Sequence, residues 1–189
     1  MKDIIINEFN EHIKAVSSLL NLTDAVATAS QICIDCLKNG GKILIFGNGG
    51  SAADAQHIAA EIVGRYKTDR KGMFAIALNT DTSILTAIGN DFGYEYLFER
   101  QVEALANKGD VVIGISTSGK SENVIRAIKL ASNLNCRSIG FSGNAGGDMN
   151  KICSINIVAP SDDTPRIQEM HIIIGHTICH LIDQEFKAR

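Results

Sequence analysis

Short apolar runs alternate with helix-like segments along most of the chain, and this alternation limits the possible folds to a few. The runs are rich in β-branched residues and cover residues 42–46, 73–78, 110–116, 137–142 and 154–158. Segments with helical periodicity lie near residues 51–65, 81–88, 93–107 and 121–134. Because the apolar runs are continuous rather than alternating with polar residues, we expect buried parallel strands. The pattern predicts an α/β fold, a doubly wound five-stranded parallel sheet flanked by helices.

Further helices precede and follow this alternating part. Apolar residues at helical spacing predict a first helix over about residues 6–20 and a second over about 23–38, which Gly40 and Gly41 end. A long last helix is expected over about 165–186, opened by Thr164 with a proline in its first turn. No linker, repeat or low-complexity tract interrupts the sequence, so we expect one domain over residues 1–189.

The composition fits a compact domain and argues against two classes of partner. With 45% hydrophobic residues in 189, the chain can bury a core without disulfides or a structural metal. The formal net charge of -3 is spread without a basic run, so we expect no nucleic-acid partner. No apolar run approaches the roughly 18 to 20 residues that cross a bilayer, so we expect no membrane partner.

The five cysteines indicate a reducing compartment. Their number is odd and no cleavable signal peptide precedes them, which favours free thiols and a cytoplasmic location. Cys33 and Cys36 match the C-x-x-C spacing of redox and zinc sites, but they lie in a helical stretch without a second pair. We expect the cysteines to be packing residues, and redox or metal use of this pair remains an alternative.

A glycine-rich loop follows the first predicted strand. It reads Phe-Gly-Asn-Gly-Gly-Ser over residues 46–51, and Ser51 and Asp54 have the spacing of a capping box for the next helix. Glycines there let backbone amides approach an anion. The loop also satisfies a loose dinucleotide fingerprint, but that reading needs an acidic residue about twenty positions on, and Asp81 lies about thirty beyond the glycines.

A hydroxyl-rich loop follows the third predicted strand. Residues 116–123 read Ser-Thr-Ser-Gly-Lys-Ser-Glu-Asn and end where a helix is expected to begin. Hydroxyls together with the free amides of a helix N-terminus form a phosphate cradle. The spacing of a nucleotide-binding P-loop is absent. Helix capping by Ser121 alone is the alternative.

Ionisable and amide side chains interrupt two apolar helices. His57 and Glu61 are four residues apart and share one helix face, which Arg65 would continue. Gln168 and His176 lie on the last helix, with His171 and His180 nearby. A salt-bridged stripe at a subunit contact would also explain the first set, and core or interface packing would explain His171 and His180.

Four segments resemble the signature segments of phosphoheptose isomerases, a branch of the SIS class of phosphosugar-binding proteins. They cover residues 47–61, 90–94, 116–121 and 167–171. The serine loop alone resembles the broad SIS class, whereas the pairs His57/Glu61 and Gln168/His176 resemble the heptose branch. The resemblance implies the SIS fold and the interconversion of sedoheptulose 7-phosphate and D-glycero-D-manno-heptose 7-phosphate. That reaction is an early step towards the heptose of surface glycans.

The resemblance also implies roles for individual residues. Isomerisation through an enediol needs a base for a carbon-bound proton and an acid for the oxygen, and we assign Glu61 as base and His176 as acid. The implied ligands of a zinc ion are His57, Glu61, Gln168 and His176. The implied contacts to the sugar phosphate are Asn48, Gly49, Gly50, Glu61, Asn90, Asp91, Ser116, Thr117, Ser118, Ser121 and Gln168. Family members are tetramers, so a homotetramer is implied.

One inference about assembly comes from helix geometry. Gln168 and His176 are eight residues apart, which places their Cα atoms about 12 Å apart on one helix. One ion can hardly be reached by both, so we expect these two ligands to come from different subunits. Two alternatives to an isomerase remain: a non-catalytic SIS protein that binds a replication initiator, and a phosphosugar sensor that binds without turnover.

Overall fold

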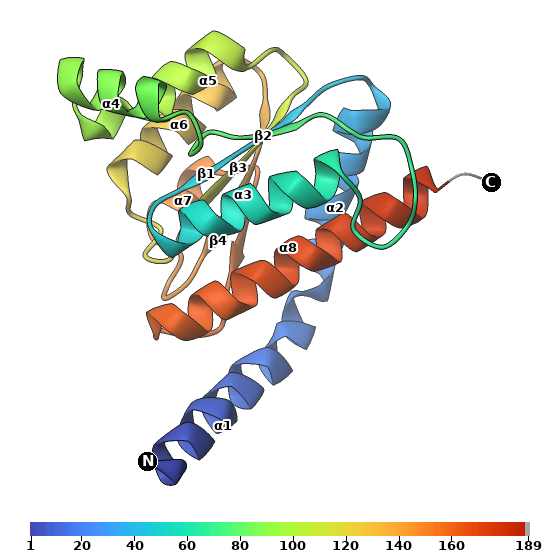
Figure 1. Cartoon of the computed structure of the whole chain (residues 1–189), viewed down its shortest axis with the longest axis vertical. Helices are drawn as coiled ribbons and strands as arrows, with labels where there is room; N and C mark the ends of the chain where they lie inside the picture. Colours follow the sequence, from blue (N-terminus) through green and yellow to red (C-terminus); the bar gives the residue numbers. More distant parts are fainter. Residues whose placement is uncertain (188–189) are drawn as a thin grey trace.

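The computed structural model describes residues 1–187 and contains one five-stranded sheet (Figure 1). Its strands are β1 (Ile43–Gly47), β2 (Ala75–Ala77), β3 (Val111–Ser116), β4 (Arg137–Ser142) and β5 (Ile155–Val158). All neighbouring strands pair in parallel, in the order β2-β1-β3-β4-β5. The predicted five-stranded parallel sheet is confirmed, although β2 is shorter than its apolar run.

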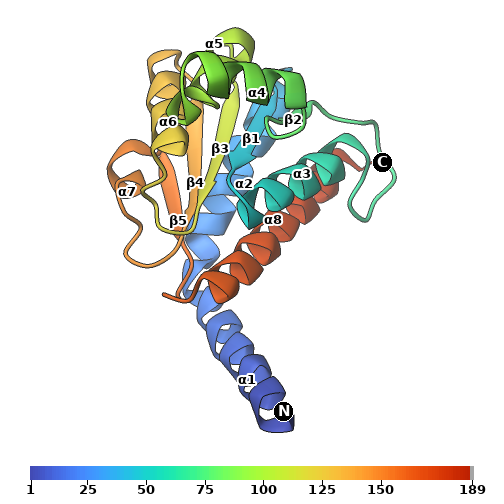
Figure 2. The same cartoon turned by 60° about the vertical axis from the view of Figure 1, so that its left-hand side comes forward.

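Helices cover both faces of the sheet (Figure 2). One layer is built from α2 (Thr23–Lys38), α3 (Gly50–Val63) and α8 (Thr164–Phe186). The other layer is built from α4 (Thr82–Asp91), η2 (Tyr94–Tyr96), α5 (Glu99–Leu105), α6 (Glu122–Asn133) and α7 (Met149–Ile152). The chain is therefore a doubly wound α/β protein, as predicted. Among the described residues, no helix is long and apolar enough to cross a membrane.

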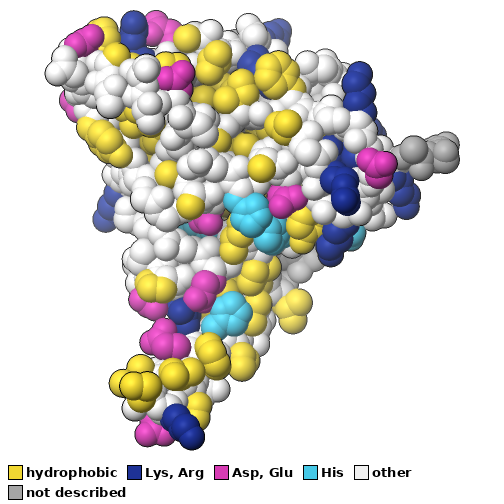
Figure 3. All heavy atoms as spheres, in the orientation of Figure 1, with side chains coloured by type: hydrophobic (Ala, Val, Ile, Leu, Met, Phe, Trp, Pro, Cys, Tyr) yellow, Lys and Arg dark blue, Asp and Glu magenta, His cyan; other side chains and the backbone are white. Residues whose placement is uncertain are grey.

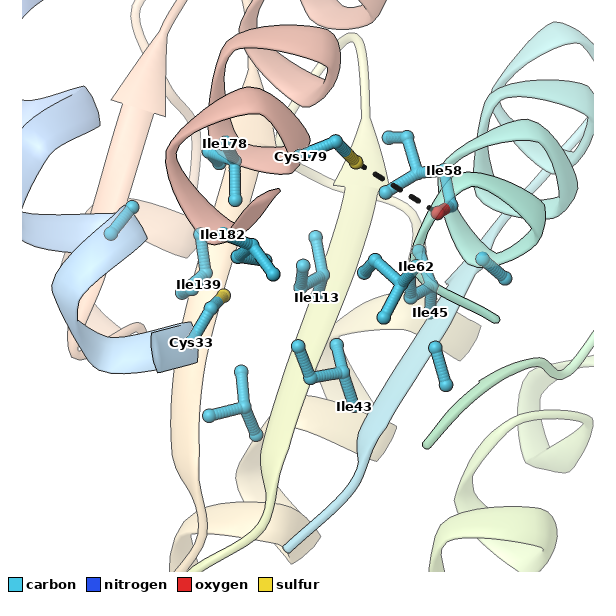
Figure 4. Packing of buried hydrophobic residues seen from close by; sticks show 14 of the residues in the cluster. Cys33, Ile43, Ile45, Ile58, Ile62, Ile113, Ile139, Ile178, Cys179 and Ile182 are labelled. Atoms are coloured by element: carbon cyan, nitrogen blue, oxygen red, sulfur yellow. Dashed lines mark hydrogen bonds between the residues drawn. The ribbon is translucent and has the colours of Figure 1, made fainter. Parts of the chain in front are cut away.

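The core consists of two apolar clusters, one on each side of the sheet. Alternate residues of the buried strands face alternate layers, so Ile43 and Ile45 pack under α3 and α8 while Leu44 and Phe46 pack under α5 and α6. Figure 4 shows Ile58 converging with residues of α8 above β1 and β3. This packing fixes α3 against α8.

The N-terminal helix α1 (Lys2–Ser18) extends away from the sheet (Figures 1 and 2). It continues through the 3-10 turn η1 (Leu19–Leu22) into α2. Its last turns pack on α8, and Glu8 and His12 of its middle turns bond side chains of α8. Several of its large apolar side chains are exposed: Ile4, Ile5, Ile6, Phe9 and Ile13. The predicted N-terminal helices are confirmed, and α1 has an apolar surface without cover in the single chain.

Two local predictions are wrong. The capping box at the start of α3 does not form, because Gly49 with a φ of 58° precedes the helix and Ser51 is buried inside its first turn. The single helix expected over 93–107 is divided into η2 and α5, which are separated at Leu97 and Phe98, and Gly93 with a φ of 103° lies before η2 rather than inside a helix. The short helix α7 was not predicted.

Candidate active site

The glycine loop and the serine loop lie side by side at the carboxyl edge of the sheet. They follow β1 and β3, which are neighbours, although the chain leaves them towards opposite edges of the sheet. Such a switch point is where open α/β sheets bind ligands. Gly47 is required there, since a Cβ would lie 2.8 Å from the Ile115 carbonyl oxygen and from the Ser51 Cβ. The fold thus brings the two predicted loops to one place.

Asn48 connects the two loops through its side chain. Its amide nitrogen donates to Asn123 Oδ1 at 2.9 Å, and Asn123 returns the same bond to Asn48 Oδ1, also at 2.9 Å. The Tyr94 hydroxyl donates to Asn48 Oδ1 at 2.9 Å. Sequence reasoning missed Asn123 and Tyr94, although both stand within segments that drew attention as motifs. Their bonds fix the glycine loop relative to the serine loop.

The serine loop folds around its own hydroxyls. Ser116 Oγ and Ser121 Oγ are 2.8 Å apart, and the Lys120 amide donates to Ser118 Oγ at 3.2 Å. Ser121 precedes α6, but its side chain bonds Ser116 rather than capping the helix, so the capping alternative is wrong. The Thr117 carbonyl accepts from the Gly143 amide at 3.0 Å. A cavity of about 420 Å³ beside the loop is lined by Ser118, Lys120, Asn144, Ala145 and Gly147.

A second constellation joins His57, Glu61 and His176 on α3 and α8. His57 Nε2 lies 3.2 Å from Glu61 Oε1 and 3.3 Å from His176 Nε2. One donor atom from each of the three residues can be chosen so that all lie within 4.8 Å of one another. Two imidazole nitrogens and a carboxylate oxygen suit a zinc ion, so these residues fit the predicted metal. Figure 3 shows histidines gathered at the centre of this face.

Close packing of α3 on α8 brings the two histidines together. Gly175, which precedes His176, lies against Ile58, which follows His57. A Cβ at Gly175 would stand 2.5 Å from Ile58 Cδ1. The absence of a side chain at this position therefore sets how closely the two helices approach.

His176 is partly buried in this constellation. Burial lowers its pKa and the neighbouring His57 lowers it further, whereas Glu61 opposes the shift. The Tyr66 ring stacks on the His176 ring with centroids 5.1 Å apart and planes inclined by 28°. Sequence reasoning missed Tyr66, which lies beyond α3 in a segment without periodic pattern. The surroundings of His176 thus favour its neutral imidazole, which lies between polar and aromatic groups.

Gln168 does not join the other three predicted zinc ligands. Its side-chain amide lies against Gly50, where an added Cβ would be 2.6 Å from Gln168 Nε2. Gly50 opens α3, and Glu61 follows eleven residues later, about 16 Å along the helix axis. Gln168 therefore belongs with the glycine loop at the start of α3, whereas His57 lies at the middle of the helix and Glu61 in its last turn.

The remaining sequence candidates divide between surface and core. Asn90 and Asp91 end α4, where both are exposed and the Asn90 amide donates to Asp91 Oδ1 at 2.8 Å. Arg65 lies beyond the end of α3 and does not continue its face. His171 is a core residue: it is fully buried, donates from Nε2 to the Ser142 carbonyl at 2.9 Å, and burial lowers its pKa to about 4.

Two alternative readings find no support in the structure. Asp81 caps α4 by accepting from the Ile84 amide at 2.9 Å, so it is engaged as a helix cap and not as the acidic residue of a dinucleotide site. Cys33 and Cys36 are buried, and burial raises the pKa of Cys33 and raises that of Cys36 to about 11. Thiols with such pKa values stay protonated and are inert.

Comparisons with known proteins agree on one family. Residues 7–143 match the SIS domain family. The phosphoheptose isomerase of Aliarcobacter butzleri is 60% identical over 99% of this chain and 100% of its own length. Phosphoheptose isomerase 1 of Campylobacter jejuni is 58% identical over 98% of this chain and 100% of its own length.

Solved structures give the same result. The phosphoheptose isomerase GmhA of Neisseria gonorrhoeae superposes with a TM-score of 0.92 at 43% identity, over 97% of this chain and 98% of that one. A phosphoheptose isomerase of Francisella tularensis superposes with a TM-score of 0.93 at 37% identity, over 96% of this chain and 97% of that one. None of these relatives is named as an initiator-binding protein, so that alternative gains no support.

Proposed function

The chain belongs to the phosphoheptose isomerase family of SIS-domain proteins and isomerises a heptose phosphate, and we propose that Glu61 and His176 are its acid-base pair. The substrate is sedoheptulose 7-phosphate, and the product is D-glycero-D-manno-heptose 7-phosphate. Residues 1–189 act as one domain in the cytoplasm. The product feeds heptose into surface glycans such as lipopolysaccharide or capsule. The convergence of Glu61 and His176 beside His57 carries the proposal.

The two side chains divide the proton transfers between them. Glu61 removes the proton from the carbon next to the carbonyl, and His176 gives a proton to the oxygen, which produces the enediol. Glu61 then returns a proton to the neighbouring carbon while His176 takes the proton from the other enediol hydroxyl, which forms the carbonyl of the aldose. The lowered pKa of His176 supports donation from a neutral imidazole N–H rather than from an imidazolium. The proton that His176 takes back in the second step restores its neutral imidazole for the next turnover.

A zinc ion is the proposed cofactor. His57, Glu61 and His176 would hold it, and Gln168 would supply a fourth ligand. When bound, the ion polarises the substrate carbonyl and stabilises the enediolate. The donor set supports zinc, since two histidines and one carboxylate are a common catalytic ligand set that leaves a position open.

The complete site is shared between subunits of a proposed homotetramer. Within one chain, Gln168 and the glycine loop stand at the start of α3, whereas His57 lies at the middle of the helix and Glu61 in its last turn. The exposed apolar side chains along α1, visible at the lower end of Figure 3, support burial against another subunit. A groove of about 430 Å³ between η1, α2 and α8 is also apolar. Assembly would cover these surfaces and bring Gln168 of one chain to the ligand cluster of another.

The sugar phosphate is proposed to span the two loops. The serine loop, Ser116, Thr117, Ser118 and Ser121, would hold the phosphate. Backbone groups of Asn48, Gly49 and Gly50 and the side chain of Gln168 would hold the sugar near C1 and C2. Asn90 and Asp91 would bind sugar hydroxyls. Because Asn48 uses its side chain within the protein, its contact to the sugar is expected through the main chain.

Isomerase turnover tests the reaction and the acid-base pair. Wild type, Glu61→Gln and His176→Gln are supplied with zinc and sedoheptulose 7-phosphate in heavy water, and proton NMR follows product and deuterium incorporation at the reacting carbon. We expect turnover and exchange in wild type and loss of both in the two variants. An inactive wild type that binds the sugar phosphate would instead identify a sensor, and an inactive wild type that captures a replication initiator would identify the adaptor.

Mixed assemblies test the shared site. His57→Ala and Gln168→Ala subunits are unfolded together, refolded together and assayed beside each variant alone. If one site takes its cluster from one chain and Gln168 from another, random mixing restores roughly a quarter of the sites. No recovery in mixtures shown by mass spectrometry to be hybrid would mean that each chain builds its own site.

A further inference from the structure

An irregular segment, residues 64–74, connects α3 to β2 and is anchored to α8 by one buried carboxylate. Asp183 is fully buried and accepts from the amides of Lys67 at 2.7 Å and Thr68 at 2.8 Å. Arg70 Nε donates to the same carboxylate at 2.6 Å. Burial alone would raise the pKa of Asp183, but these donors hold it below its usual range. The carboxylate is thus ionised and fully engaged.

Arg70 extends this anchor to the end of α3. Its guanidinium donates to the carbonyl oxygens of Glu61 at 3.0 Å and Ile62 at 2.9 Å, which belong to the last turn of the helix. The side chain is 1% exposed. A cation at a helix C-terminus satisfies carbonyl groups that lack partners and suits the negative end of the helix dipole. Arg70 therefore ties α8, through Asp183, to the turn of α3 that carries Glu61.

The anchored segment places Tyr66 on the histidines of α8. The Tyr66 ring stacks on His176 and meets the His180 ring edge-on, with centroids 6.2 Å apart and planes at 66°. Lys67 holds its ammonium 5.1 Å from the centre of the same ring. Since Tyr66 stands one residue before the first amide bonded to Asp183, the position of its ring follows from that bond.

We propose that Asp183, Arg70 and Tyr66 are positioning residues for the isomerisation, which orient the His176 imidazole towards Glu61 and the substrate. The inference rests on the proposed role of His176. A buried ion pair gives little net stability, because desolvation of the two charges offsets their attraction. What this pair does provide is geometry: it fixes the ring that stacks on His176 and the turn that bears Glu61. A reacting group displaced by about 1 Å can cost a hundredfold in rate.

Variants of Tyr66 separate positioning from stability. Tyr66→Phe keeps the stacking ring, and Tyr66→Leu removes it. We expect Tyr66→Phe to retain kcat, and Tyr66→Leu to lower kcat by roughly ten- to a hundredfold with little change in KM. Arg70→Lys, which keeps the charge but loses the planar fork, should behave like Tyr66→Leu. Asp69→Asn, at an exposed position of the same segment, is the matched control and should keep wild-type kcat.

A spectroscopic measurement gives a readout that does not depend on activity. The chain has five histidines, so ring-labelled protein gives few Cε1–H signals, and His176→Gln identifies the signal of His176. The ring current of the aromatic side chain at position 66 should change the chemical shift of that signal in wild type, Tyr66→Phe and Asp69→Asn. This ring-current shift should be lost in Tyr66→Leu and reduced in Arg70→Lys. Melting curves on the same samples show that each variant is folded.

The outcomes separate this inference from the proposed function. If wild type isomerises the sugar while folded Tyr66→Leu keeps its kcat, the positioning role is wrong and the proposed function stands. An unchanged His176 signal in Tyr66→Leu would also overturn it. If the ring contact is seen but wild type does not turn over, the proposed function fails instead.

Discussion

Gly175→Ala should damage the active centre more than it damages stability. The new Cβ would stand 2.5 Å from Ile58 Cδ1 and 2.7 Å from Ile58 Cγ1, far inside ordinary contact. Ile58 is 1% exposed and packed between the sheet and α8 (Figure 4), so it has little room to move. The helices must therefore separate by a sizeable fraction of an ångström at the point where His57 and His176 meet.

The expected size of each effect can be worked out separately. Overpacking in a filled core costs about 1 to 3 kcal/mol, and alanine gains about 1 kcal/mol over glycine inside a helix. The net loss of stability is then roughly 0 to 2 kcal/mol, which urea unfolding at fixed protein concentration measures. Displacement of His176 relative to Glu61 should lower kcat by up to about a hundredfold. Zinc affinity, measured by competition with a chelating dye, should fall as well.

Two further variants make the test strict. Ile58→Val deletes Cδ1, the nearest atom, so the double variant Gly175→Ala/Ile58→Val should recover part of the lost kcat. Gly89→Ala is the control for helix propensity, because Gly89 also lies in a helix and its added Cβ would meet nothing within 4 Å. The Gly89→Ala protein should be slightly more stable than wild type. If Gly175→Ala keeps wild-type kcat, or if Ile58→Val gives no recovery, the packing of these two residues does not set the spacing of the histidines.

Three further predictions concern other parts of the site. Asp54 has a buried carboxylate oxygen without a partner among the described residues, and burial raises its pKa to about 6. The folded protein then binds more protons than the unfolded chain between about pH 4 and 6, so its stability falls as pH rises through that range. Asp54→Asn should therefore raise the melting temperature more at pH 8 than at pH 5. Asn123→Ala removes both amide bonds to Asn48 and should raise KM for the sugar phosphate by roughly tenfold in steady-state kinetics, whereas an unchanged KM would exclude a role in fixing the two loops. Removal of metal with a chelator should abolish turnover, and added zinc should restore it. His57→Gln should need at least about tenfold more zinc than wild type for recovery in a metal titration. An equal zinc requirement in the two proteins would show that His57 is not a ligand.

Much of the fold could be predicted from the sequence because the periodic signals are strong. Continuous apolar runs between helical segments indicate parallel strands, and the two polar loops follow the strands that become central neighbours. The separation of Gln168 from His176 also follows from helical rise alone. It is consistent with the structure, in which Gln168 lies beside Gly50.

The remaining site features depend on contacts between distant residues. The pair Asn48 and Asn123 is separated by 75 positions, and neither residue shows its partner in its own surroundings. Tyr66 stands in a segment without periodicity, and its contact with His176 exists only because Asp183 holds that segment from another helix. The predicted capping box failed for a local reason: the positive φ of Gly49 moves the helix start to Gly50, which places Ser51 inside the helix.

The order of α3 and α8 along the chain bears on how the protein is made. His57 leaves the peptidyl-transferase centre 119 residues before His176, which at roughly 5 to 20 residues per second is a delay of about 6 to 24 seconds. During that time α3 and one face of the sheet have no cover from α8. A chain cut short by premature termination before α8 would carry the glycine loop and the serine loop but lack His176, the Asp183 anchor and the four buried side chains that α8 adds to the core on that face. The nascent chain thus gains its proposed catalytic centre only after α8 has been synthesised.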